Sequence, residues 1–67
     1  MAVVRPLVEM KNWRRERGMT RAMAAEHFQV SPVTIWRWEA GERRPARHLA
    51  ARVSEEIDVP LATLLGI

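Results

Sequence analysis

Arginine is the side chain with the most binding chemistry in this sequence, because it accounts for ten of the eleven cationic residues. A guanidinium can donate two parallel hydrogen bonds to a phosphate or to the edge of guanine. Residues 5–47 carry a net charge of +5 and residues 48–67 a net charge of −2. This asymmetry favours a surface that binds a polyanion. The alternatives are cations that only solvate helix faces and a compositional bias toward arginine.

No arrangement of side chains in the sequence suits catalysis or metal binding. His27 and His48 lie 21 residues apart, with no carboxylate or thiol cluster at ligand spacing, and the chain has no cysteine. We also find no Ser-His-Asp arrangement and no glycine-rich loop that would cradle a phosphate. The sequence therefore predicts a protein that is not an enzyme and that needs no metal, cofactor or small-molecule ligand.

A short helix over residues 31–39 is the element best suited to present binding side chains. Ser31 can accept a hydrogen bond from the first turn, and Pro32 suits the first helical position because its missing N–H would be unpaired there. Gly41 can adopt the left-handed conformation that ends helices, and Pro45 prevents continuation. Both ends of this helix are thus marked in the sequence.

The two sides of this helix differ in character. Ile35 and Trp38 are three residues apart and share the side that we expect to enter the core. The opposite side carries Pro32, Val33, Trp36 and Arg37. Stability does not explain an exposed valine and an exposed tryptophan, so this side is a candidate binding surface.

The rest of the chain is predicted to form further short helices around one core. Apolar residues recur at helical spacing over residues 6–17, 20–28, 45–57 and 61–65. No segment shows the alternation of a strand, and no apolar run is long enough to span a membrane. The predicted fold class is all-α. A chain of 67 residues forms one domain, which we place at residues 6–67 behind a flexible arm at residues 1–5.

From residue 10 to residue 45 the sequence resembles, without a gap, the helix-turn-helix of phage Cro and repressor proteins, the XRE family. The family pattern includes Ser-x-x-Thr-Ile-x-x-Trp-Glu-x-Gly followed by a basic loop that ends in proline. The sequence matches the pattern at Arg14, Gly18, Met19, Thr20, Ala25, Phe28, Val30, Ser31, Thr34, Ile35, Trp38, Glu39, Gly41, Arg43, Arg44 and Pro45. The resemblance implies a compact five-helix lambda-repressor-like domain, with the helix-turn-helix at its second and third helices.

The resemblance also implies a function, namely sequence-specific binding of double-stranded DNA by a transcriptional regulator, by default a repressor. Bases would be read by Pro32, Val33, Thr34, Trp36 and Arg37. Phosphates would be bound by Thr20, Arg21, Ser31, Arg43, Arg44 and Arg17. Arg17 and Arg47 are weaker candidates, since an arginine at a helix end can instead cap carbonyl groups. Relatives also form an ion pair at the positions of Arg14 and Glu39, and the alternative is two solvent-exposed charges.

Some of these roles have alternatives, and two residues depart from the family pattern. Trp36 would pack on a sugar or a thymine methyl, or else be partly buried against the second helix. Thr34 would bond to a phosphate or a base, or else make a helix-stabilising contact to its own backbone. Gln29 stands where the family usually has glycine with a positive φ, at a cost on the order of 1 kcal/mol. Arg21 replaces a common glutamine, which keeps a phosphate contact but loses any amide-specific base contact.

Relatives bind near-palindromic operators as two-fold dimers, with recognition helices about 34 Å apart. The apolar residues near the end of this chain exceed what a short terminal helix needs for docking, so we assign them to a homodimer contact: Leu61, Leu64, Leu65 and Ile67. We expect a cytoplasmic protein of bacterial, phage or prophage origin, with RNA polymerase as a second partner if it activates. Antitoxins and restriction-modification controllers share this pattern. A protein-interaction module that keeps the fold is the alternative from another class.

Overall fold

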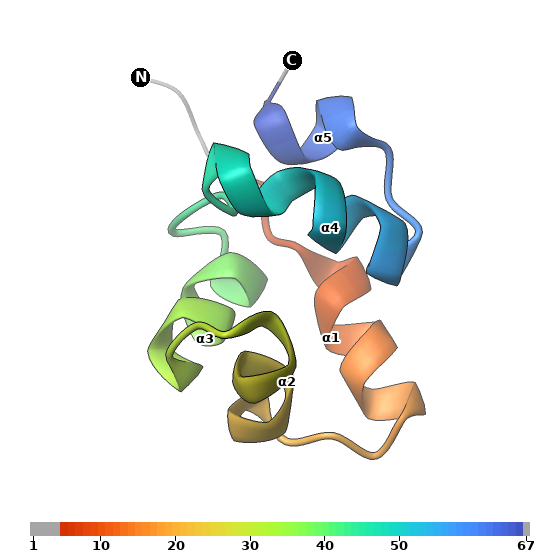
Figure 1. Ribbon diagram of the computed structural model, residues 1–67, viewed down its shortest axis with the longest axis vertical. Coiled ribbons are helices and arrows are strands. Elements are labelled where there is room, and N and C mark those ends of the chain that lie inside the picture. Colours follow the sequence, from red (N-terminus) through yellow and green to blue (C-terminus); the bar gives the residue numbers. More distant parts are fainter. Residues whose placement is uncertain (1–4, 67) are drawn as a thin grey trace.

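The computed structural model describes residues 5–66, and within them the chain forms five helices and no strand (Figure 1). In chain order the helices are α1 Val8–Glu16, α2 Arg21–Phe28, α3 Pro32–Ala40, α4 Arg47–Ile57 and α5 Leu61–Leu65. Figure 1 shows α1, α2 and α3 grouped in the lower part of the molecule, with α4 and α5 above them. This architecture is the all-α, five-helix fold that the sequence predicted.

The corner between α2 and α3 is built by two capping side chains and one left-handed residue. The Thr20 hydroxyl caps α2 by accepting a hydrogen bond from the Met23 amide at 3.1 Å. The Ser31 hydroxyl caps α3 by accepting one from the Thr34 amide. Gln29 ends α2 with a φ of 57°, so the turn forms without glycine, at a cost on the order of 1 kcal/mol.

Small side chains on the buried face of α2 let α3 come close. Ala24 and Ala25 are buried there, and the Phe28 ring lies 6.3 Å from the Trp38 ring of α3 between centroids. On its other side Phe28 meets Trp13 of α1 at 5.4 Å. These buried aromatic rings join three helices, so the inner side of α3 is fixed by packing.

The core extends upward between α1 and the last two helices. Ala50 and Val53 of α4 and Leu64 of α5 are buried in it together with Met10 of α1. The apolar face of α4 thus packs against the group formed by α1, α2 and α3 and also gives α5 an apolar surface to contact.

The first helix begins later than predicted, at Val8 rather than near Pro6. The Val8 amide donates to the Pro6 carbonyl at 3.0 Å, so Leu7 is the centre of an inverse γ-turn and the helix starts after it. The Leu7 amide donates to the Trp38 carbonyl at 3.0 Å. Leu7 therefore connects the start of α1 to the end of α3.

The arm that we predicted at residues 1–5 lies outside the described residues, except for Arg5. Arg5 forms an exposed ion pair with Glu9, the second residue of α1. Such surface pairs contribute little to stability. Ile67 also lies outside the described residues.

Candidate nucleic-acid interface

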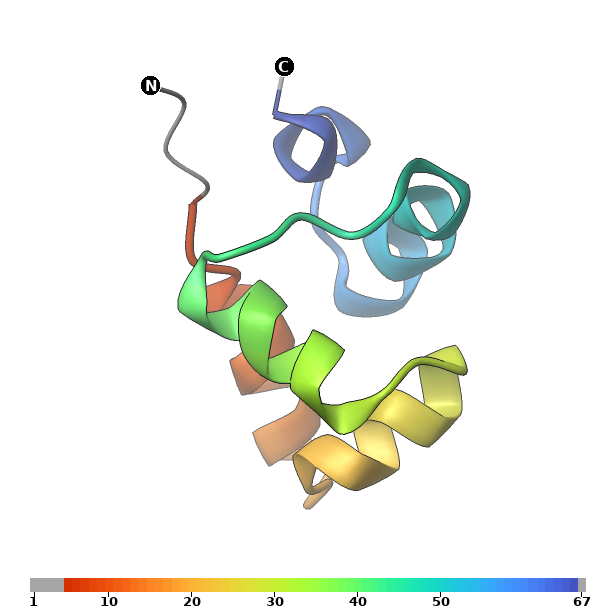
Figure 2. The ribbon, with the colours of Figure 1, turned by 90° about the vertical axis from the view of Figure 1, so that its left-hand side faces the viewer.

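The outer side of α3 is exposed, whereas its inner side is buried. Val33, Trp36 and Arg37 all face solvent, and the Trp36 residue keeps 42% of its surface exposed. Ile35 and Trp38 are buried in the core. Figure 2 shows α3, in green, at the front of the molecule with no other element covering this side. The helix therefore presents one arginine and large apolar side chains from a rigid support.

The hydroxyl groups at the start of α3 contact each other. Ser31 Oγ and Thr34 Oγ1 lie 2.9 Å apart, and Ser31 Oγ also accepts from the Thr34 amide at 3.4 Å. Thr34 is half-buried, whereas Ser31 and Pro32 are exposed. The Thr34 hydroxyl thus contacts the Ser31 side chain at the helix start, whereas the predicted alternatives were DNA and its own backbone.

Glu39, near the end of α3, receives hydrogen bonds from two arginines. Arg14 of α1 donates through Nε to Oε2 at 2.7 Å and through Nη2 to Oε1 at 3.0 Å. Arg21 of α2 donates through Nε to Oε1 at 3.2 Å. Arg14 also donates to the Met19 carbonyl at 3.3 Å. One carboxylate therefore links α1, α2 and α3, and the predicted Arg14–Glu39 pair is joined by a third member.

Burial decides how these charges behave. The Glu39 side chain is 5% exposed and that of Arg14 10%, whereas Arg21 keeps 42%. Burial alone raises the pKa of Glu39, but the hydrogen bond from Arg14 and the positive charges of Arg14 and Arg21 hold this pKa below its ordinary value. Hydrogen bonding to Glu39 raises the pKa of Arg14. Glu39 is thus a carboxylate at neutral pH. Arg21 bonds to it through Nε, while part of the Arg21 side chain stays exposed.

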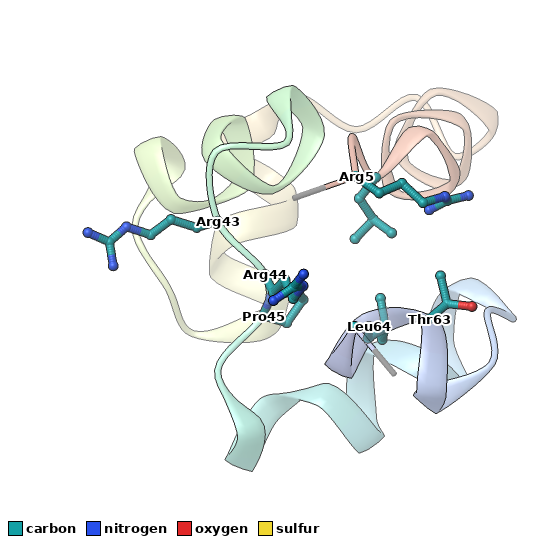
Figure 3. Close-up of a pocket in the computed structure, with 8 residues that line it drawn as sticks. Arg5, Arg43, Arg44, Pro45, Thr63 and Leu64 are labelled. Carbon is teal, nitrogen blue, oxygen red and sulfur yellow. The ribbon is translucent and has the colours of Figure 1, made fainter. Parts of the chain in front are cut away.

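The two loop arginines after α3 point in different directions. Figure 3 shows Arg43 extending away from the molecule, while Arg44 lies against the cavity beside Pro45 and Leu64. This cavity has a volume of about 420 Å³. A Cβ placed on Gly66 would lie only 2.5 Å from Arg44 Cζ, so the guanidinium rests on the end of α5. Arg43 therefore extends into solvent, whereas Arg44 lies against the end of α5.

Comparison with protein families identifies this arrangement of helices. A helix-turn-helix family model, of the XRE and lambda-repressor type, matches residues 10–64. The chain belongs to this family. Its members are DNA-binding regulators, so the chain is a DNA-binding helix-turn-helix protein. No curated protein and no solved structure matches the chain significantly.

Two further findings concern what this helix-turn-helix protein contains. Within residues 5–66 no helix is long and apolar enough to cross a membrane. The same residues hold no group of three or more His, Cys, Asp or Glu side chains that would bind a metal ion.

Arg17, a weaker phosphate candidate of the helix-turn-helix, directs its guanidinium to the end of α1. Its Nη1 donates to the Trp13 carbonyl at 3.2 Å, and its guanidinium carbon lies 4.7 Å from the centroid of the Trp13 ring. These contacts cap α1 and cover a buried indole by a cation–π interaction. The structure thus places Arg17 in the carbonyl-capping role that was its alternative.

The described residues that were assigned to the dimer contact of the helix-turn-helix protein differ in their exposure. Leu64 is 2% exposed, so its assignment was wrong: its side chain fills the core between α4 and α5 and is not available to a second chain. Leu65 is half-buried against the core, and Leu61 is 41% exposed. Of the four residues, Leu61 is thus the main exposed candidate, because Ile67 lies outside the described residues.

Two cations of the helix-turn-helix domain were missed by the sequence reasoning. Arg52 of α4 donates to the His27 carbonyl at 2.6 Å, which fastens α4 to the last turn of α2. Lys11 lines a cleft of about 140 Å³ beside Arg21 and Trp36. The signal for Lys11 was its position three residues before Arg14 on one helix, since residues at this spacing are neighbours on the helix surface.

Proposed function

We propose that this protein is a sequence-specific regulator of transcription that binds double-stranded DNA by inserting α3 into the major groove. One observation carries the proposal: the outer side of α3 exposes Val33, Trp36 and Arg37 while buried Ile35 and Trp38 hold the helix rigidly. A rigid support is what base reading requires, since contacts to base edges depend on placement of the side chain. The exposed arginines at both ends of this surface, Arg21 and Arg43, support the same function.

Arg37 is the proposed reader of guanine, because its guanidinium can donate to O6 and N7 together. Val33 lies one turn before Arg37 on the same row of α3, and Pro32 is exposed beside it. Neither Val33 nor Pro32 has a side-chain donor, so both favour thymine methyl groups. A bidentate base contact of the kind proposed for Arg37 contributes about 1–3 kcal/mol of discrimination.

Phosphate contacts position such a helix without reading sequence. We assign them first to Arg21, which starts α2, and to Arg43, which extends from the loop after α3. The exposed caps Thr20 and Ser31 border the same surface. Arg44 is a weaker assignment than the sequence suggested, because it rests on α5.

Binding as a two-fold dimer to a near-palindromic operator is part of the proposal. Recognition helices about 34 Å apart would then enter successive major grooves. The exposed Leu61 of α5 and the half-buried Leu65 are the apolar residues that we assign to the contact between chains. A dimer bound over a promoter would repress by blocking polymerase in a bacterial cytoplasm, and an antitoxin or controller that regulates its own gene would bind in the same way.

The test is selection of bound sites from a random duplex library, followed by anisotropy titrations with the selected operator. The expected motif has two-fold symmetry, and Arg37→Ala should relax preference at one guanine by about 1–3 kcal/mol. Arg47→Ala, which removes an exposed arginine at the start of α4, is the matched control and should leave the motif unchanged. Absence of any enriched motif, together with binding that ignores salt, would exclude this function.

A second candidate is a protein-interaction module, favoured by the exposed Val33 and Trp36. Large exposed apolar side chains often mark protein contacts. A variant with alanine at both Trp36 and Arg37 separates the two functions. Loss of a protein partner with unchanged DNA binding would favour the interaction module, whereas loss of specific DNA binding favours the regulator.

A further inference from the structure

A shallow cleft between α1, α2 and α3 opens beside the outer side of α3. Its volume is about 140 Å³, and its lining residues are Lys11, Arg21, Trp36, Glu39 and Ala40. Three helices thus contribute, although only α2 and α3 form the helix-turn-helix. The cleft combines two cations, which can bind a phosphate, with an indole ring, which can pack on the adjoining sugar.

The lining of this cleft keeps a net positive charge, because it holds two cations and one carboxylate. Glu39 is the one carboxylate among its lining residues, and its buried oxygens already accept three hydrogen bonds from Arg14 and Arg21. Lys11 makes no ion pair among the described residues. Arg21 uses Nε for Glu39 and keeps 42% of its side chain exposed. An anion in the cleft would therefore meet two cations and no exposed carboxylate from the lining.

The exposed residues of α3 fall into two rows at four-residue spacing. Pro32, Trp36 and Ala40 form one row, and the last two of them line the cleft. Val33 and Arg37 form the neighbouring row, and neither lines it. Trp36 thus lies on the side of α3 that faces Lys11 and Arg21, one row away from the proposed guanine reader Arg37.

We propose that this cleft binds one backbone segment of the DNA, with a phosphate between Lys11 and Arg21 and the adjoining deoxyribose against the Trp36 ring. The inference rests on the proposed function and sharpens it, because it gives Lys11 a phosphate contact and moves Trp36 from base reading to backbone binding. Glu39 acts as a positioning residue, since it holds Arg21 at the edge of the cleft. Sugar and phosphate are present at every step of a duplex, so this contact adds affinity without sequence preference.

The test uses the full chain, the selected operator and a scrambled duplex of equal length. In anisotropy titrations across a salt series, Lys11→Gln should weaken binding to both duplexes by the same factor. It should also reduce the slope of log K against log[salt] by about 1. Arg15→Gln is the matched control, because it removes one exposed charge from the same helix but lies outside the cleft. Its slope should stay at the wild-type value.

Trp36 is tested by repeating the site selection with Trp36→Ala and Trp36→Phe. The inference expects an unchanged motif and a similar loss of affinity for operator and scrambled DNA, smaller for phenylalanine. A change of the preferred base at one position would overturn it, and so would a Lys11→Gln slope equal to that of Arg15→Gln. If either of these contrary results appears while Arg37→Ala still relaxes the motif, the backbone cleft is excluded and the proposed function stands. If wild-type protein selects no motif, the proposed function fails as well.

Discussion

Glu39→Gln is the perturbation that most directly tests the link between the three helices. Glutamine keeps the size of the side chain but removes the charge that both Arg14 and Arg21 contact. Arg14 then remains in a site where its side chain is only 10% exposed, without a counter-charge. The variant thus isolates the electrostatic part of this contact from its packing.

The magnitude follows from burial. Removing one partner of a buried ion pair costs about 3–5 kcal/mol. Arg14 keeps its hydrogen bond to the Met19 carbonyl, and the glutamine oxygen still accepts one hydrogen bond, so we expect about 2–3 kcal/mol here. For a domain of this size each kcal/mol lowers Tm by about 4–8 °C. The expected fall in Tm is therefore about 10–20 °C, a large part of the stability of a small domain.

The assay is thermal and urea unfolding followed by circular dichroism, with Glu42→Gln as the control. Glu42 is an exposed loop residue, so the same loss of charge there should change stability by less than about 0.5 kcal/mol. A double-mutant cycle with Arg14→Met should give a coupling energy of at least about 1 kcal/mol. If Glu39→Gln and Glu42→Gln lower Tm equally, the proposed role of this buried pair in stability is refuted.

Three further results are expected. The folded-state pKa of Glu39 lies below its ordinary value, so the stability that ionised Glu39 contributes is complete above about pH 4.3 and is lost as the pH falls through the lower folded-state pKa. Urea midpoints measured from pH 2 to 6 should therefore fall on acidification, less steeply in Glu39→Gln than in the wild type. Equal slopes of midpoint against pH in the two proteins would contradict this. Gln29→Gly should stabilise the domain by about 0.5 kcal/mol, because glycine adopts a φ of 57° without strain. The greater freedom of glycine in the unfolded chain offsets part of this gain. A lower urea midpoint than wild type would show that the left-handed corner is not strained. Leu64→Ala should lower the stability of the monomer by about 2–5 kcal/mol, because Leu64 is buried. Leu61→Ala, at an exposed position, should lower it by less than about 0.5 kcal/mol but should weaken dimers in sedimentation. The reverse ranking of unfolding midpoints would contradict the assignment of Leu64 to the core.

The helices and the helix-turn-helix corner were largely predictable from the sequence, because their signals are local. Thr20 and Ser31 cap helices through hydrogen bonds to residues three positions later, and the caps form as predicted. Helical spacing likewise placed Ile35 and Trp38 in the core, and both are buried. Contacts over three or four residues depend on helix geometry alone, so they can be read without knowledge of the fold.

Directions of long side chains were not predictable, because they depend on which partners the fold brings within reach. Arg21 and Arg44 were both assigned to phosphates from their place in the chain. Arg21 is tied to Glu39, 18 residues away, whereas Arg44 rests on the end of α5. An arginine has several rotatable bonds, and its direction is chosen by carboxylates and surfaces that only tertiary packing places beside it.

The sequence by itself determined the helices and the buried side of α3 through residue spacing, and membership of the helix-turn-helix family through its match to the family pattern. Only the tertiary structure placed Lys11 beside Trp36 and buried Leu64. The physical reason is the same in both cases. A helix pattern shows which residues share a face, but the neighbour that covers or leaves open each part of that face is decided by how the helices pack.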